Sequence, residues 1–228
     1  MTGDLASATL SDVLNGANVA AIGDGSGANW ELFQFTTANL VAERTYDIGG
    51  RLRGQAGTDG IMPDNWPAGS TIVIMNGALQ QIDLPLSSRG LARNYRIGPA
   101  QRGYDDPSYV HLVEAFDGIG LRPYCPAHLR AVTNPTGDVS LNWIRRTRVD
   151  GDSWQSVEVP LGEDFESYTV RVFKDQALKR EVVVSTPEFA YSASAQSADG
   201  VSGDFEIAVA QVSARFGTGP FKRIMING

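Results

Sequence analysis

Two histidines and one cysteine are the side chains best suited to nucleophilic chemistry in this sequence of 228 residues. Hydrolysis through an activated nucleophile needs a base held beside that nucleophile. His111 lies in an apolar, strand-like segment, and His128 follows Cys125 by three residues, with no Asn or Asp placed to complete a cysteine-protease arrangement. We therefore expect both histidines to be structural, and we expect no catalytic residues and no enzymatic activity.

Carboxylates are the next candidates, because pairs of them cleave glycosidic bonds and carboxylates among glycines bind calcium. Glu163-Asp164 and Asp105-Asp106 have no context that distinguishes them among 26 acidic residues, so we interpret them as turn residues. Asp24 and Asp59 stand among glycines, where calcium binding is the alternative to a tight turn. Neither has the spacing of a calcium-binding loop. The sequence thus predicts no metal and no cofactor.

The segment best suited to binding combines arginines with a tryptophan. Asp150-Gly151 is a strong hairpin-turn signal, with arginines before it and a tryptophan after it. Arg and Trp are enriched at binding hot spots, and a planar indole also stacks on sugar faces. The candidate contacts to a partner or glycan are Arg145, Arg146, Arg148 and Trp154.

These four residues also have a purely structural interpretation. Acidic side chains follow the hairpin at Glu158, Glu163 and Asp164. In this alternative the arginines pair with those carboxylates, and the tryptophan covers the edge of a sheet.

The composition excludes several classes of partner. A net charge of −7 opposes attraction to nucleic acid and to anionic membranes. No apolar run approaches the roughly 18 residues of a membrane span, so we expect no membrane insertion. A single cysteine allows neither an internal disulfide nor a thiolate metal site, which suits synthesis in a cytosol.

Alternating apolar residues predict the fold class, which is all-β. Val139, Leu141 and Trp143 share one face of a strand, and two further triplets, beginning at Tyr168 and Phe205, repeat the pattern. Such strands pack in two layers, so we expect Trp143 to point inward. Glycine and proline at short intervals favour many short strands.

A proline-containing segment at residues 121–126 and a shift in charge suggest two domains. Residues 1–121 hold 7 basic against 13 acidic side chains, and residues 122–228 hold 12 against 13. We predict an irregular β-rich domain over 1–121 and a β-sandwich over 122–228. The expected helix is 11–16, capped by Ser11. The expected strands are 19–22, 30–36, 45–52, 71–75, 79–84, 95–98, 109–116, 128–132, 139–143, 168–172, 178–184, 189–195, 205–212 and 221–226.

The second domain resembles a fibronectin type III domain. The resemblance rests on Pro126-x-x-Leu129, the Trp143 strand, the Tyr168-x-Val170-x-Val172 strand and the closing Gly217-x-Gly219-Pro220. It implies a seven-stranded sandwich of about 100 residues. The connection between Trp143 and Tyr168 is longer than is usual in such domains.

Nearly the whole chain resembles the carboxyl-terminal region of the large tail-hub protein of bacterial gene transfer agents, a megatron-like baseplate protein often labelled a host specificity protein. The resemblance rests on residues 12–16, 52–58, 89–93, 95–100 and 143–154. It implies a structural role at a phage-like tail tip and a trimeric parent protein, whereas an isolated fragment could be a monomer. The glycosidase-like barrel of that family matches nothing here.

The leading hypothesis is therefore a non-enzymatic component of a phage-like tail tip or baseplate. It would be made in the bacterial cytoplasm and incorporated into a released particle, with other tail proteins as partners and a host surface glycan as a further contact. The alternative is a carbohydrate-binding module centred on Trp154, or on Trp30 and Trp66. A third hypothesis, a hydrolase accessory domain, would depend on His111.

Overall fold

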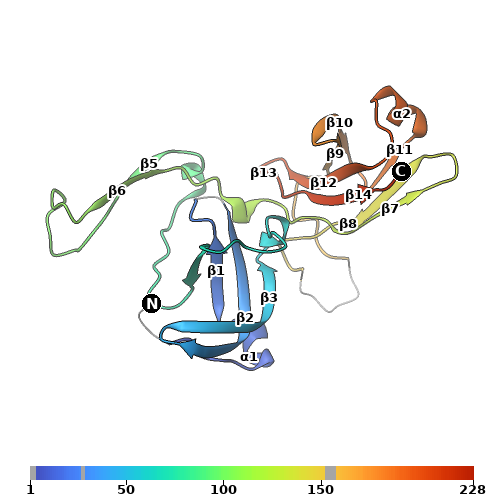
Figure 1. Cartoon of the computed structure of the whole chain (residues 1–228). Coiled ribbons are helices and arrows are strands. Elements are labelled where there is room, and N and C mark those ends of the chain that lie inside the picture. The colour runs from blue at the N-terminus through green and yellow to red at the C-terminus, as the bar shows by residue number, and fades with distance from the viewer. Residues whose placement is uncertain (1–3, 27–28, 152–157) are drawn as a thin grey trace. The chain divides into compact units, whose positions relative to one another are not determined.

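The computed structural model describes residues 4–26, 29–151 and 158–228, which form an all-β fold with short helices (Figure 1). Contacts divide the chain into two compact units. One comprises residues 1–79 together with 123–228, and the other comprises residues 80–122. The second unit ends at Arg122, within the proline-containing segment 121–126 at which the sequence predicts a boundary. The predicted domains, 1–121 and 122–228, stay a prediction.

The amino-terminal part of the first unit is an antiparallel sheet with the strand order β3-β2-β1-β4. Its elements are α1 (Leu10–Leu14), β1 (Val19–Gly23), β2 (Trp30–Ala42), β3 (Thr45–Gln55), η1 (Thr58–Gly60) and β4 (Thr71–Ile74). Ala20, Phe33 and Phe35 form its buried core. Alternation along β2 places both phenylalanines on the same face.

The N-cap of helix α1 lies two residues earlier than the sequence predicts. Thr9, not Ser11, is the N-cap, because its hydroxyl accepts a hydrogen bond from the Asp12 amide. The Asp12 carboxylate accepts one from the Thr9 amide in return, which completes a capping box. The helix buries Val13 against the sheet.

The carboxyl-terminal part of the first unit is a two-sheet sandwich. Its elements are β7 (Ala127–Thr133), β8 (Val139–Ile144), β9 (Tyr168–Lys174), β10 (Ala177–Val184), β11 (Glu188–Tyr191), α2 (Ala193–Ala198), β12 (Phe205–Ser213), β13 (Gly217–Thr218) and β14 (Lys222–Ile226). One sheet has the order β11-β8-β7, and in the other β10, β9 and β12 are successive neighbours, with β13 and β14 pairing with β12. This is the strand arrangement of a fibronectin type III domain, as predicted.

The core of the sandwich confirms the inward face that alternation predicts. Trp143 is only 4% exposed and packs edge-to-face on Tyr168, with ring centroids 5.1 Å apart. Val170 and Val172 of β9 and Ile207 of β12 are fully buried around them. The two sheets are therefore held together by the side chains that repeat every second residue.

Two predicted strands are wrong in part or whole. The strand expected over 189–195 ends at Tyr191, because Ser192 caps a helix by accepting a hydrogen bond from the Ala195 amide. The segment 79–84 forms no strand. A turn precedes it, in which the Leu79 amide donates to the Asn76 carbonyl and the Asn76 side chain accepts from the Ala78 amide.

The second unit, which we call the arm, consists of residues 80–122. Its elements are η2 (Leu86–Ser88), β5 (Arg93–Ile97), β6 (Val110–Glu114) and η3 (Ile119–Leu121). The strands pair with each other in a two-stranded antiparallel sheet. Tyr95 packs edge-to-face against Phe116, with centroids 5.9 Å apart. No helix in the described part of the chain is long and apolar enough to span a bilayer.

Candidate functional site

Two of the predicted binding arginines are engaged in ion pairs within the connection between β8 and β9. Arg145 donates to the Glu158 carboxylate at 2.8 Å and to the carbonyls of Val159 and Pro160. Arg148 donates to Glu163 at 2.8 Å, and both of these side chains are largely buried. These contacts match the structural interpretation of the cluster, and they join the beginning of the long connection to its later part.

The third arginine has a different partner from any that the sequence suggests. Arg146 donates to the Asp59 carboxylate of η1 at 2.7 Å. Its guanidinium also lies over the Tyr124 ring, 5.0 Å from the centroid. Asp59 is thus an ion-pair partner, in a segment where the sequence favours a tight turn. Trp154, the fourth residue, lies outside the described residues, and the binding role of the cluster stays a prediction.

The surroundings of the two histidines and the cysteine do not favour nucleophilic chemistry. His111 lies on β6, where its Nε2 is 2.9 Å from the Asn94 side-chain oxygen on the neighbouring strand. His128 is on β7 with a positive φ of 51°. Burial, with a smaller contribution from the Asp59 carboxylate, raises the pKa of Cys125 to about 11. A thiol with that pKa stays protonated near neutrality and is a poor nucleophile.

The predicted turn at Asp24 is held by local hydrogen bonds. The carboxylate accepts from the Ser26 side chain, from the Asn29 side chain and from the Ser26 amide, and these bonds lower the pKa of Asp24 to about 2. Within residues 4–26, 29–151 and 158–228, no group of three or more His, Cys, Asp or Glu side chains is arranged to hold a metal ion.

A buried carboxylate that the sequence analysis did not single out organises the amino-terminal sheet. Glu31 lies on the same face of β2 as Phe33 and Phe35, because the three are spaced two residues apart. Its side chain is 0% exposed. The facing strand β3 has a register shift between Leu52 and Gln55. Such a bulge leaves backbone groups unpaired and redirects side chains. Here it directs Arg53 and the Gly54 amide toward Glu31.

The bulge depends on Gly54. Its φ of 65° lies in the left-handed region. A Cβ added there would lie 2.7 Å from the Asp59 Cβ atom, so the position has neither the backbone freedom nor the space for a side chain.

Glu31 accepts four hydrogen bonds. Oε1 accepts from Arg53 Nε at 2.9 Å and from the Gly54 amide at 3.1 Å, while Oε2 accepts from Arg53 Nη2 at 2.7 Å and from Trp66 Nε1 at 2.6 Å. Burial is the largest single effect on this carboxyl and raises its pKa. The donors together outweigh it, so the pKa of Glu31 lies below its ordinary value. The carboxylate therefore stays charged and holds Arg53, Gly54 and Trp66 in place. We call these four residues the Glu31 clamp.

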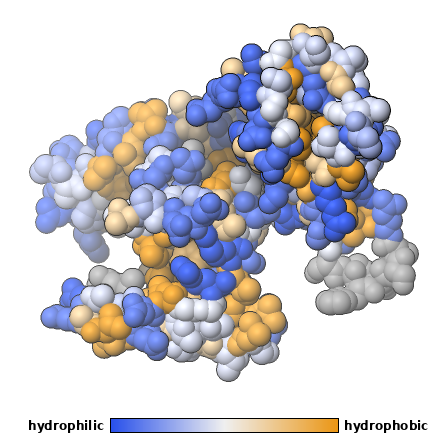
Figure 2. Space-filling view, turned by 45° about the vertical axis from the view of Figure 1, so that its right-hand side comes forward, coloured by the Kyte–Doolittle hydropathy of each residue, from blue (hydrophilic) through white to orange (hydrophobic). Residues whose placement is uncertain are grey.

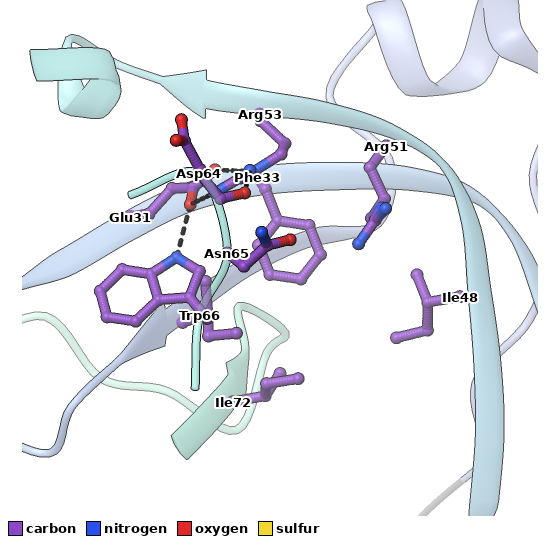
Figure 3. Close-up of a pocket in the computed structure, with 10 residues that line it drawn as sticks. Glu31, Phe33, Ile48, Arg51, Arg53, Asp64, Asn65, Trp66 and Ile72 are labelled. Atoms are coloured by element: carbon purple, nitrogen blue, oxygen red, sulfur yellow. Dashed lines mark hydrogen bonds and ion pairs between the residues drawn. The ribbon is translucent and has the colours of Figure 1, made fainter. Parts of the chain in front are cut away.

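The clamp forms one wall of a pocket of about 250 Å³. Figure 3 shows Trp66 on one side of it and Ile48 and Arg51 on the other, with Asn65 between them. Its remaining lining consists of Asp64 and of the apolar Ile22, Phe33 and Ile72. Trp66 is one of the tryptophans considered for glycan binding. Trp30, the other on this sheet, donates its indole N–H to the Ser26 carbonyl at 2.6 Å and does not line the pocket.

The arm exposes apolar side chains on strands that have no second layer. Val110, Leu112 and Val113 of β6 are between 41% and 56% exposed. Among residues 80–122 only Ser88 is fully buried. Apolar patches also lie open at several places in the surface view of Figure 2. The arm thus lacks an apolar core of its own.

One protein family matches the chain, through a model described as "Rcc01698-like, C-terminal" over residues 1–73. These residues include the Glu31 clamp. No curated protein matches the sequence.

Several solved structures align with the chain at low similarity. The rat CD45 extracellular region, domains d3-d4, is 8% identical, with 84% of this chain and 94% of that chain covered and a TM-score of 0.36. The FN1-FN3 domains of chicken CNTN1 are 14% identical, covering 92% and 66%, with a TM-score of 0.33. The FN5 domain of Drosophila Lar is 17% identical, covering 46% and 95%, with a TM-score of 0.29.

Proposed function

We propose that this protein is a structural component of a phage-like, gene transfer agent tail tip or baseplate, where it packs against other tail proteins and contacts the host cell surface. The proposal rests on one observation, which is that the arm is a two-stranded sheet with exposed apolar side chains. An isolated two-stranded sheet is marginally stable in water, because it buries too little apolar surface to offset its loss of conformational entropy. The arm is such a sheet, and its apolar residues are exposed.

A protein partner would supply the second layer that the arm lacks. Exposed contiguous apolar surface on a soluble protein marks a site of interaction. A subunit of an assembly has such surface in isolation and buries it on incorporation. The arm therefore fits a chain that functions among other proteins.

The match over residues 1–73 supports the same conclusion, since that family is named after a gene transfer agent-associated protein. The sandwich suits a tail tip because a well-packed two-sheet core holds its loops in place without a flexible active site. Under this proposal the protein is no enzyme. It is made in the bacterial cytoplasm and leaves the cell as part of a particle.

The proposal is tested by incorporation into particles. Phage-like particles released by the source bacterium are purified, and the chain is located by immunogold labelling and quantified by mass spectrometry. We expect label at the tail tip. The double variant Val110→Asp with Leu112→Asp should be lost from particles, because the charges prevent burial of β6.

A matched control distinguishes docking from solubility. Leu178 and Val183 of β10 are 51% and 70% exposed, and the double variant Leu178→Asp with Val183→Asp should be incorporated normally. Particles that lack the chain altogether, or arm variants incorporated as well as the control, would refute the proposal.

Light scattering at several concentrations gives the oligomeric state, for which we propose a trimeric parent protein and a monomeric fragment.

A further inference from the structure

We propose that the pocket beside Trp66 binds a single uncharged sugar ring, as one unit of a polysaccharide. The inference deepens the proposed contact with the host surface, and its geometry stands without the tail-tip role. The pocket is small, at about 250 Å³, against ~300–1,000 Å³ for typical small-molecule sites. It therefore has room for one ring and not for a larger ligand.

The Glu31 clamp prepares the Trp66 ring for stacking. Because the indole N–H is held by Glu31 at 2.6 Å, the ring is fixed in one orientation before any ligand arrives. Pre-organisation of this kind reduces the entropy lost on binding. Glu31 itself is unavailable to a ligand, since its four acceptor positions are occupied by Arg53, Gly54 and Trp66. What remains for a ligand is the ring and the apolar lining.

Free polar groups border this apolar surface. Among the described residues, no hydrogen bond engages the side chain of Arg51, Asn65 or Asp64, although all three line the pocket; the Asp64 carboxylate interacts electrostatically with Arg53. Together they offer guanidinium and amide donors with amide and carboxylate acceptors. Figure 3 shows the Asn65 side chain beside Trp66 and the Arg51 guanidinium across the pocket from the indole ring.

This combination matches the chemistry of a sugar. A pyranose ring has C–H groups that pack on an indole, and a rim of hydroxyls that both donate and accept hydrogen bonds. A phosphate or other anion fits less well, because the two arginines and the two carboxylates that line the pocket leave it without net charge. A lipid chain would leave Arg51, Asn65 and Asp64 without partners. We therefore assign the site to a neutral, hydroxylated ring.

The test is an array of bacterial surface glycans probed with the full chain, followed by calorimetric titration of the best neutral glycan. We expect Arg51→Ala to weaken binding by roughly tenfold or more, because it removes a charge-assisted hydrogen bond. Arg51 is exposed and unpartnered, so its loss leaves the fold intact. Trp66→Leu, which keeps apolar bulk but removes the ring, should weaken binding by about three- to tenfold.

Arg130→Ala is the matched control, since Arg130 is an exposed arginine of strand β7, far along the chain from the pocket residues. It should bind as the wild type does. The proposal is overturned if no glycan binds, if only acidic glycans bind, or if Arg51→Ala and Arg130→Ala bind equally well. Particle incorporation is measured independently, so failure of glycan binding and failure of the tail-tip role are distinguishable.

Discussion

Replacement of Glu31 by glutamine removes the buried charge while keeping the shape of the side chain. The amide keeps one oxygen, which can accept from two of the four donors that Glu31 now satisfies. Its NH₂ group then faces the other two donors. If the oxygen takes the place of Oε1, Trp66 Nε1 loses its acceptor, and Arg53 Nη2 loses one of two and keeps the Pro63 carbonyl.

A buried donor left without an acceptor costs about 1–3 kcal/mol, which applies to Trp66 Nε1. Removal of one partner from a buried ion pair costs about 3–5 kcal/mol, which is the larger effect. We therefore expect Glu31→Gln to lower the free energy of unfolding of the amino-terminal sheet by roughly 3–5 kcal/mol. The assay is urea unfolding at pH 7, followed by tryptophan fluorescence and circular dichroism.

Glu181→Gln is the matched control. Glu181 pairs with Arg171 at 2.6 Å, but both side chains are well exposed, so this change should cost only ~0–1 kcal/mol. Equal effects of the two substitutions would refute the reasoning that burial makes the Glu31 pair important.

The pKa of Glu31 adds a pH dependence to the same experiment. Because the pKa is lower in the folded protein than its ordinary value of 4.5, the ionised carboxylate stabilises the fold at pH values above 4.5. That stabilisation is lost as the pH falls from 4.5 through the lower folded pKa. The difference between wild type and Glu31→Gln should therefore shrink below pH 4.5. A difference that grows with acidification would contradict the direction of the pKa shift.

Three further predictions concern other parts of the chain. Trp143→Ala should lower the free energy of unfolding of the sandwich by about 3–5 kcal/mol in urea titrations, because it opens a cavity against Tyr168; a loss below ~1 kcal/mol would place Trp143 outside the core. Cys125, with a pKa of about 11, should react with iodoacetamide at pH 8 far more slowly in the folded chain than in urea, and equal rates would show an accessible thiolate. Thr9→Ala should cost about 1 kcal/mol in thermal unfolding through loss of the capping box, whereas Ser11→Ala should cost little, and the reverse order would restore Ser11 as the cap.

The sandwich could be predicted from the sequence because its strands alternate strictly. Val139, Leu141 and Trp143 are all buried, as their spacing requires. The helix α2 was missed because its residues, mostly alanine and serine, carry no apolar period, and only the capping serine at Ser192 marks its start. Local hydrogen bonding there outweighs the strand-like pattern that ends at Tyr191.

The pocket could not be predicted as a whole, although one signal pointed to it. Glu31 alternates with Phe33 and Phe35, so the sequence alone indicates an acidic residue at a core-facing position. Its partner could not, because Arg53 reaches it only through a bulge whose register no local pattern specifies. The ion pair between Arg146 and Asp59 joins residues 87 positions apart, and only the folded chain brings them together.

Amide hydrogen exchange along β5 and β6 tests most directly whether the arm owes its order to a partner. In the isolated chain, we expect amides of the arm to exchange more than roughly 100-fold faster than those of the buried strands β9 and β12. In purified particles the same amides should become protected. Arm amides as slow to exchange as those of β9 and β12 in the isolated chain would show that the arm is stable alone, and would contradict the proposal that a partner protein stabilises it.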